Sequence, residues 1–328
     1  MEYRDFGNTG MRISALGFGC GAVGGLMVRG EHRDMLRSVK LALDSGINYY
    51  DTARMYGEGL SEMHTGAVLR ELHASDAIVG TKVRIDPPDF ADLQSAVARH
   101  IEGSLLRLGM DTVDIIYTHN PIGNTSVPDR GVLSLDDLGQ IATAFERAVE
   151  QGKLRFWGFN GLGDTEAIQK AIDTYKPSGI HTAFNMLNPT TGYPAPGGYP
   201  YQDYGEVMNR AAAQGTGTVA IRILAGGALS GSMERHPVAA QGVAPIGTGR
   251  TMEEDLARTE AFRFLVDDGY ADSLVDASIR FVLNSPALST ALVGIASYDQ
   301  IETAIQAANK GPLSQEAIDR IKGVWMAM

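Results

Sequence analysis

Residues 46–57 read Gly-Ile-Asn-Tyr-Tyr-Asp-Thr-Ala-Arg-Met-Tyr-Gly, an apolar run followed at once by ionisable side chains. The run 47–50 has the β-branched and aromatic composition that strands favour. Similar runs recur along the chain between longer helical patterns, an alternation typical of parallel β/α units. Eight units predict a closed (β/α)8 barrel, or TIM barrel. The expected strands are 16–19, 47–50, 77–81, 113–117, 156–158, 179–184, 217–221 and 290–293.

The helical patterns carry apolar residues at spacings of three and four, which predicts helices with one face against the barrel wall. Glycines at 46 and 152 follow two of these patterns, where a left-handed residue commonly ends a helix. The clearest pattern is 90–108, whose apolar positions are Leu93, Val97, Ile101, Leu105 and Leu108.

Two terminal segments lie outside the β/α repeat. Residues 3–6 and 12–14 flank the turn signal Gly-Asn-Thr-Gly at 7–10, which predicts a β-hairpin that covers the bottom of the barrel. An extra helix is expected at the C-terminus. We therefore expect a single barrel domain over residues 1–328, with long irregular loops at 188–204 and 225–255.

The composition is that of a globular protein. Of 328 residues, 44% are hydrophobic and 20% are charged, close to the average for this class. The net charge of −11 opposes binding to nucleic acid or to an anionic membrane. The single cysteine, Cys20, cannot form an internal disulfide, and the charged N-terminus lacks the apolar run of a signal peptide. We expect a cytoplasmic protein.

Four ionisable residues follow three successive strand runs. Asp51 and Tyr56 follow 47–50, Lys82 follows 77–81, and His119 follows 113–117. Each has an ordinary explanation alone, as a helix cap, a solvent-facing amine, a packed ring or a local hydrogen bond. Because the C-terminal ends of barrel strands converge on one face, their joint occurrence favours a catalytic site.

These residues suit the reduction of a carbonyl by hydride, which requires a proton at the developing oxyanion. The pKa of a phenol is about 10, and a neighbouring ammonium such as Lys82 lowers it. Asp51 is expected to keep Lys82 charged, while His119 hydrogen-bonds the substrate oxygen or itself donates the proton. No metal site is expected, since no third ligand has suitable spacing and Lys82 opposes a cation.

Three segments resemble the aldo-keto reductase superfamily in the expected order: 46–62, Ile-Val-Gly-Thr-Lys at 78–82, and Asp-Ile-Ile-Tyr-Thr-His at 114–119. The resemblance implies that Tyr56 is the general acid/base, that Lys82 and Asp51 tune it, and that His119 orients the carbonyl. It also implies a nicotinamide cofactor that lies across the barrel mouth without the glycine fingerprint of Rossmann folds.

The resemblance extends to cofactor contacts, with departures. Asn160 and Gly161 stand where Ser-Asn is usual, His181 where glutamine is usual, and Ile221 where a flat side chain commonly backs the nicotinamide ring. Segment 224–231 resembles the pyrophosphate-binding stretch, and 293–302 the adenosine end. The expected cofactor residues are Gly21, Asp51, Asn160, His181, Ile221, Arg222, Leu224, Gly226, Leu229, Gly294, Ser297 and Gln300.

The adenosine-end segment lacks the lysine or arginine that usually meets the 2′-phosphate of NADP. Arg222, Arg250 or Arg258 could supply that charge, or could equally be surface or loop-anchoring residues. NADP(H) is favoured as the cofactor, with NAD(H) as the alternative.

The sequence thus predicts an NAD(P)(H)-dependent oxidoreductase that reduces aldehydes or ketones, or oxidises the corresponding alcohols or sugars. The alternative is a cofactor-binding regulatory or sensing barrel with little turnover. A hydrolase is disfavoured, because the paired carboxylates or metal cluster of such sites is lacking. The loop 188–204 is either a substrate lid whose tyrosines stack on the substrate or a plain solvent loop, and these motifs specify neither the substrate nor the oligomeric state.

Overall fold

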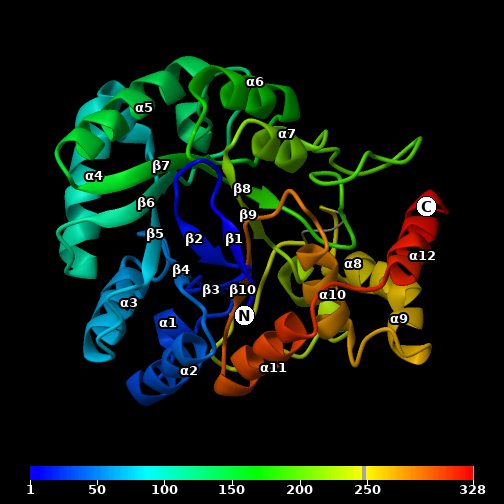
Figure 1. The fold of residues 1–328 in the computed structure, drawn as a ribbon. Helices are drawn as coiled ribbons and strands as arrows, with labels where there is room; N and C mark the ends of the chain where they lie inside the picture. The colour runs from blue at the N-terminus through cyan, green and yellow to red at the C-terminus, as the bar shows by residue number, and fades with distance from the viewer. Residues whose placement is uncertain (246–248, 328) are drawn as a thin grey trace.

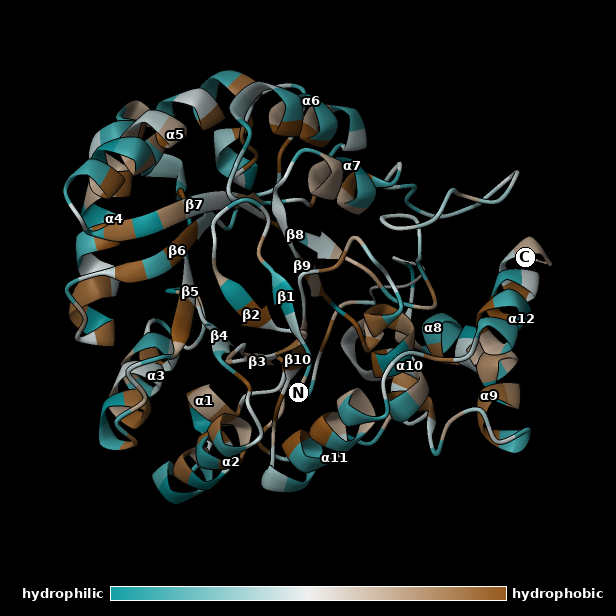
Figure 2. Ribbon diagram, in the orientation of Figure 1, coloured by the Kyte–Doolittle hydropathy of each residue, from teal (hydrophilic) through white to brown (hydrophobic). Residues whose placement is uncertain are grey.

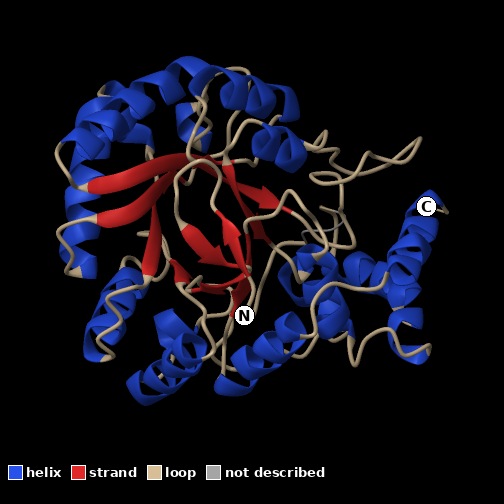
Figure 3. Ribbon diagram, in the orientation of Figure 1, coloured by secondary structure: helices blue, strands red, loops and turns tan. Residues whose placement is uncertain are grey.

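The computed structural model describes residues 1–245 and 249–327, and its centre is a closed barrel of eight parallel strands (Figures 1 and 3). Neighbouring strands follow chain order, and β10 pairs with β3 to close the ring. The predicted (β/α)8 barrel is confirmed. The strands are β3 (Leu16–Gly19), β4 (Tyr49–Asp51), β5 (Ile78–Val83), β6 (Val113–Thr118), β7 (Leu154–Asn160), β8 (Gly179–Ala183), β9 (Gly217–Ile221) and β10 (Thr290–Gly294).

Helices surround the barrel (Figure 3). They are α1 (Leu26–Arg29), α2 (His32–Asp44), α3 (Leu60–Glu71), α4 (Leu93–Leu108), α5 (Leu135–Glu150), α6 (Thr165–Tyr175), α7 (Val207–Ala213), α8 (Met252–Thr259), α9 (Phe264–Asp267), α10 (Leu274–Leu283), α11 (Tyr298–Asn309) and the extra C-terminal helix α12 (Gln315–Met326). Short 3-10 helices are η1 (Pro87–Ala91), η2 (Pro128–Arg130), η3 (Ala225–Ser230) and η4 (Glu260–Phe262).

The outer helices are amphipathic, with brown and teal residues alternating around them in Figure 2. All five apolar positions predicted to face inward on α4 are buried. This helix begins at Leu93 rather than at 90, because the carboxylate of Asp92 caps it by accepting a hydrogen bond from the Ser95 backbone amide (3.1 Å).

Five strands, β4, β5, β6, β7 and β10, reach further toward their C-terminal ends than their apolar runs predict, and three of them do so with polar side chains of the site. Asp51, Lys82 and Asn160 lie inside β4, β5 and β7, paired in register with Gly80, Tyr117 and His181 respectively. The apolar pattern ends early because these polar side chains project into the barrel mouth while their backbones remain in the ladder. The ladder therefore fixes the backbone beneath each of them.

The barrel interior is filled by one cluster of side chains, and the N-terminal hairpin contributes to it. This hairpin pairs β1 (Tyr3–Asp5) with β2 (Arg12–Ser14). Phe6 enters the barrel where Gly179 and Gly217 begin β8 and β9; a Cβ on either glycine would lie 2.8 Å or less from the Phe6 ring. The prediction that the hairpin covers the bottom is confirmed. The cluster comprises Phe6, Met11, Ile13, Tyr49, Ile115, Tyr117, Val219 and Leu292.

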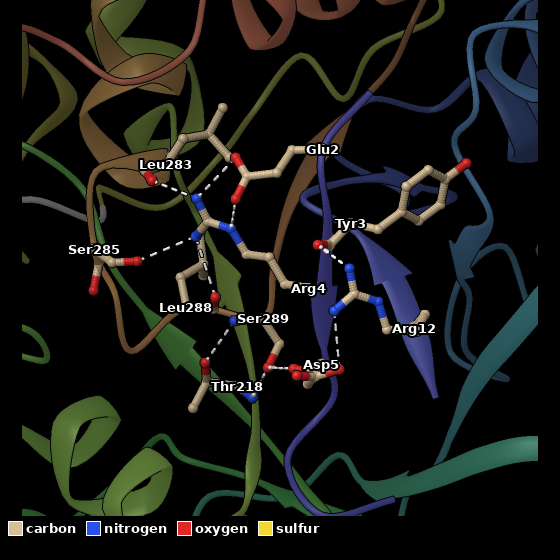
Figure 4. Close-up of polar contacts among 10 residues, drawn as sticks. All are labelled: Glu2, Tyr3, Arg4, Asp5, Arg12, Thr218, Leu283, Ser285, Leu288 and Ser289. Atoms are coloured by element: carbon tan, nitrogen blue, oxygen red, sulfur yellow. Dashed lines mark hydrogen bonds and ion pairs between the residues drawn. The ribbon is translucent and has the colours of Figure 1, made fainter. Parts of the chain in front are cut away.

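Arg4 ties the hairpin to the C-terminal end of α10 (Figure 4). Its guanidinium donates hydrogen bonds to the backbone carbonyls of Leu283 (2.7 Å), Ser285 (3.1 Å) and Leu288 (3.2 Å). Glu2 holds the guanidinium from the other side, with its carboxylate 2.8 Å from Arg4 Nε. Carbonyls at a helix end lack intrahelical partners, so one cation satisfies several of them.

The two long loops are anchored to the rest of the chain. In 188–204, the ring of Tyr193 packs against Phe184, Phe281 and Trp325, with centroid distances of 5.2–6.1 Å. Tyr193 therefore supports the fold and is not available to stack on a substrate. The segment 225–255 contains η3 and the start of α8, and its residues 246–248 lie outside the described part. Among the described helices, none is long and apolar enough to cross a membrane.

Candidate active site

Polar side chains form a layer at the C-terminal ends of the barrel strands. Alternate strand residues face the same side, so Asp51 lies above the inward ring of Tyr49, and His119 lies above that of Tyr117. The structure thereby brings together the residues that sequence alone assigned to successive strand ends. The layer consists of Asp51 from β4, Lys82 from β5, His119 just after β6, Asn160 from β7 and His181 from β8.

Asp51 and Lys82 form a buried ion pair, with side chains 5% and 3% exposed. Lys82 Nζ also donates to the backbone carbonyl of Thr52 (2.8 Å). Burial acts to raise the pKa of Asp51, but Lys82 and His181 together outweigh it and the pKa falls to about 2. Burial acts to lower the pKa of Lys82, which Asp51 and Tyr56 nevertheless raise above its usual value. Both members of the pair are therefore charged at neutral pH.

Tyr56 lies in the turn between β4 and α3, and its ring centroid is 5.1 Å from Lys82 Nζ. Burial raises the pKa of Tyr56, Lys82 lowers it, and the net pKa lies above the ordinary value. Lys82 acts on the phenol pKa in the direction expected from the sequence, but burial and the charge of Asp51 outweigh it. The phenol is therefore protonated at neutral pH, the state that a proton donor requires.

His119 faces the same phenol. The two rings meet edge-on, with centroids 5.5 Å apart and planes at 86°. Burial and the charge of Lys82 lower the pKa of His119 to about 3, so the imidazole is neutral. Its Nδ1 is buried without a hydrogen-bond partner among the described residues. A neutral imidazole beside a phenol can hydrogen-bond an oxygen placed between them.

Contacts to the second carboxylate oxygen of Asp51 were not predicted. The Tyr49 hydroxyl donates to Asp51 Oδ2 (3.3 Å) and lies 3.2 Å from the Tyr117 hydroxyl. His181 Nε2 is also 3.3 Å from Oδ2, and its ring lies 4.2 Å from that of Tyr117. The period-two alternation of β4 and β6 could have placed both tyrosines beneath the site. Because His181 faces Asp51, it has a contact beyond the cofactor role expected for it.

A groove of about 480 Å³ lies between η3 and the start of α11, at the C-terminal ends of β9 and β10. Its lining includes five of the predicted cofactor residues: Arg222, Leu224, Gly226, Gly294 and Gln300. The others lie elsewhere: Gly21 is next to the Tyr56 ring, Ile221 ends β9, Leu229 is fully buried, and Ser297 is the N-cap of α11. The groove thus gathers part of the predicted cofactor set, while Asp51, Asn160 and His181 lie in the polar layer itself.

Asn160 supplies an independent indication of a polar ligand. Its side chain is 7% exposed, and Oδ1 has no hydrogen-bond partner among the described residues. Nδ2 donates to the His119 backbone carbonyl (3.4 Å). A buried acceptor without a donor is costly unless a ligand supplies one. The carboxamide N–H of a nicotinamide is such a donor.

The three arginines considered for a 2′-phosphate lie in different places. Arg222 lines the groove, together with the carboxylates Glu234 and Asp299. Arg250 and Arg258 instead lie over the ring of Tyr201, at 5.6 and 4.1 Å from its centroid, so they contact the 188–204 loop. Within residues 1–245 and 249–327, no cluster of three or more His, Cys, Asp or Glu side chains is arranged for a metal ion.

Comparisons with known proteins extend over nearly the whole chain. L-galactose dehydrogenase of Arabidopsis thaliana is 26% identical over 99% of this chain and 94% of its own length. A probable voltage-gated potassium channel subunit beta of Oryza sativa subsp. japonica is 25% identical, covering 99% and 96%. L-glyceraldehyde 3-phosphate reductase of Escherichia coli strain K12 is 26% identical, covering 98% and 91%.

Among solved structures, the holo form of an aldo-keto reductase from Bacillus halodurans superposes with a TM-score of 0.73. The identity is 23%, over 99% of this chain and 96% of that one, so this likeness concerns the fold. In sequence, residues 15–326 match the Aldo/keto reductase family. With the barrel, the strand-end layer and this match in agreement, the chain belongs to the aldo/keto reductase family.

Proposed function

We propose that this protein transfers hydride between a nicotinamide cofactor and a small carbonyl compound, with Tyr56 as the general acid/base. The substrate is an aldehyde or ketone in the reducing direction, or the corresponding alcohol or sugar in the oxidising direction. The observation that carries the proposal is the meeting of Tyr56, Lys82 and His119 around one point of the barrel mouth. Membership of an oxidoreductase family supports the same reaction class.

In the proposed reaction the bound cofactor supplies the hydride, and side chains of this protein donate the proton and stabilise the charge. The Tyr56 hydroxyl donates its proton to the carbonyl oxygen as negative charge develops there. Lys82, held charged by Asp51, stabilises the phenolate left behind. His119, neutral because it is buried, orients the same oxygen by a hydrogen bond. In the oxidising direction the phenolate removes the alcohol proton.

For the cofactor, Asn160 Oδ1 would accept a hydrogen bond from the carboxamide, and the groove at η3 and α11 would hold the phosphates and adenosine. NADP(H) remains favoured over NAD(H), with Arg222 and Arg235 as arginines that line the groove. Fluorescence titration with NADPH and NADH tests this preference. Tighter binding of NADH would reverse it without affecting the proposed chemistry.

The test of the proposal is Tyr56→Phe, which keeps the ring and removes the proton donor. We expect kcat for a broad set of aldehydes to fall by about 10²- to 10⁴-fold, with cofactor affinity retained. Tyr270→Phe is the matched control, because its hydroxyl contacts Glu316 on the outer surface, away from the barrel mouth. Turnover that survives Tyr56→Phe would remove this residue from the mechanism.

A cofactor-binding barrel with little turnover is the second candidate, and the similarity to probable potassium channel beta subunits favours it. The two candidates separate in the same experiment. Tight cofactor binding combined with no Tyr56-dependent turnover of any aldehyde would establish the binding role and exclude the enzymatic one.

A further inference from the structure

Arg84 lies on the wall of the barrel mouth, one step above the catalytic lysine. It directly follows β5, and strand alternation directs it to the same side as Gly80 and Lys82, toward the barrel axis. The position of Gly131, in the loop after β6, confirms where the side chain goes: a Cβ built there would lie 3.1 Å from Arg84 Nη2. The guanidinium is therefore held between the ends of β5 and β6, next to the loop that carries His119.

The guanidinium is incompletely partnered. Its ion pair is with Asp86, at 3.7 Å from Nε, which is beyond hydrogen-bond distance. Asp86 is held more closely by Arg54, through Nη2. Within residues 1–245 and 249–327, no protein group accepts a hydrogen bond from Arg84, although its side chain is only 31% exposed. Two guanidinium groups thus share one carboxylate.

The neighbouring charges leave an excess of positive charge at this wall. The next acid along the chain, Asp89, is already paired with Arg99 (3.1 Å) and His100 (2.9 Å). Asp51 and Lys82 neutralise one another, and His119 is uncharged. The charge of Arg84 reaches the catalytic histidine, where it adds to burial and Lys82 in lowering the pKa of His119. In a chain of net charge −11, this cationic wall beside the reacting oxygen is a local exception.

We propose that Arg84 binds an anionic substituent of the substrate, a carboxylate or a phosphate, and that carbonyl compounds bearing such a group are the preferred class. The inference rests on the proposed reductase function. An arginine presents its N–H donors as a planar fork that matches both anions. Arg54 holds Asp86 and so leaves the Arg84 donors directed at the mouth.

The experiment compares matched substrate pairs in the wild type, Arg84→Met and Arg84→Lys. Succinic semialdehyde is paired with butanal, and glyceraldehyde 3-phosphate with glyceraldehyde, so that the carboxylate and the phosphate are tested in separate arms. For at least one pair we expect Arg84→Met to lower the anionic-to-neutral ratio of kcat/KM by about 10- to 100-fold, mainly through KM. Arg84→Lys is expected to fall between, because it keeps the charge and loses the fork.

Arg33→Met on α2 is the matched control, since Arg33 is 82% exposed and contacts only Asp34 among the described charges. A second readout needs no turnover of an anionic aldehyde: succinate or inorganic phosphate should inhibit butanal reduction competitively in the wild type and about tenfold less in Arg84→Met. An unchanged ratio in both arms, with Tyr56-dependent turnover of the neutral aldehydes, would overturn the anion site alone. If Tyr56→Phe left the turnover of every aldehyde unchanged, the proposed reductase function would instead be overturned.

Discussion

Both carboxylate oxygens of Asp51 have neighbours, and these contacts indicate what His181 does in the site. Lys82 holds one oxygen, while the Tyr49 hydroxyl and His181 Nε2 lie 3.3 Å from the other. His181 lowers the pKa of Asp51, together with Lys82 and against burial. We therefore infer that His181 positions the ion pair, in addition to the cofactor contact expected at its position.

Replacing His181 with alanine should move the acid limb of the pH profile. Without the imidazole the pKa of Asp51 rises, so the carboxylate is protonated at a higher pH and Lys82 loses its counter-ion sooner. We expect the acid limb of kcat/KM to shift to higher pH, and His181→Gln, which keeps a donor, to restore part of the shift. If the profile is unmoved and only cofactor affinity falls, His181 serves the nicotinamide alone.

At this scale the sequence predicted which ionisable residues lie together at the barrel mouth, but not the contacts that surround them. Asp51, Lys82 and His119 could be identified because each follows an apolar run. The contacts of Tyr49 and His181 with Asp51 depend on the stagger between strands, which pairs Asp51 with Gly80 and His181 with Asn160. No local pattern encodes that stagger.

Among the elements, the N-terminal hairpin has the most unusual attachment. It is short, yet it fills the barrel with Phe6 and holds the end of α10 through Arg4. The turn signal at 7–10 was enough to predict the hairpin. The contacts of Arg4 were not predictable, because its partners lie some 280 residues away in the chain.

Arg4→Met should destabilise the fold, because it leaves three backbone carbonyls at and beyond the end of α10 without their donor. We expect the free energy of unfolding to fall by about 1–3 kcal/mol, measured by urea denaturation. Arg12→Met removes only contacts on the exposed side of the hairpin and should cost less than about 1 kcal/mol. If the free energy of unfolding fell equally in the two variants, the hydrogen bonds from Arg4 to the end of α10 would not stabilise the fold more than the surface contacts of Arg12.

For the whole molecule, the buried histidine of the active site couples stability to pH. The folded pKa of His119 is about 3, below its ordinary value of 6.5, so folding favours the neutral form. Its contribution is complete above pH 6.5 and declines as the pH falls toward the folded pKa.

Unfolding free energies measured by urea at pH 8, 6, 5 and 4 should therefore decrease below pH 6.5. The contribution of His119 to this slope is at most about 1.4 kcal/mol per pH unit. His119→Gln should make the dependence shallower while the general acid sensitivity of the other groups persists. If the free energy of unfolding of the wild type and of His119→Gln depended on pH in the same way, His119 would not contribute to this pH dependence.

The side chains that fill the lower half of the barrel restrict the route by which ligands can enter and leave. Phe6 closes one end, and Tyr49 and Tyr117 occupy the space between it and Asp51. The polar layer therefore lies at the bottom of the barrel mouth, and the barrel beneath it is filled by side chains. In the proposed reaction, cofactor and substrate would both enter through the barrel mouth, so the one that lies deeper would bind first and leave last.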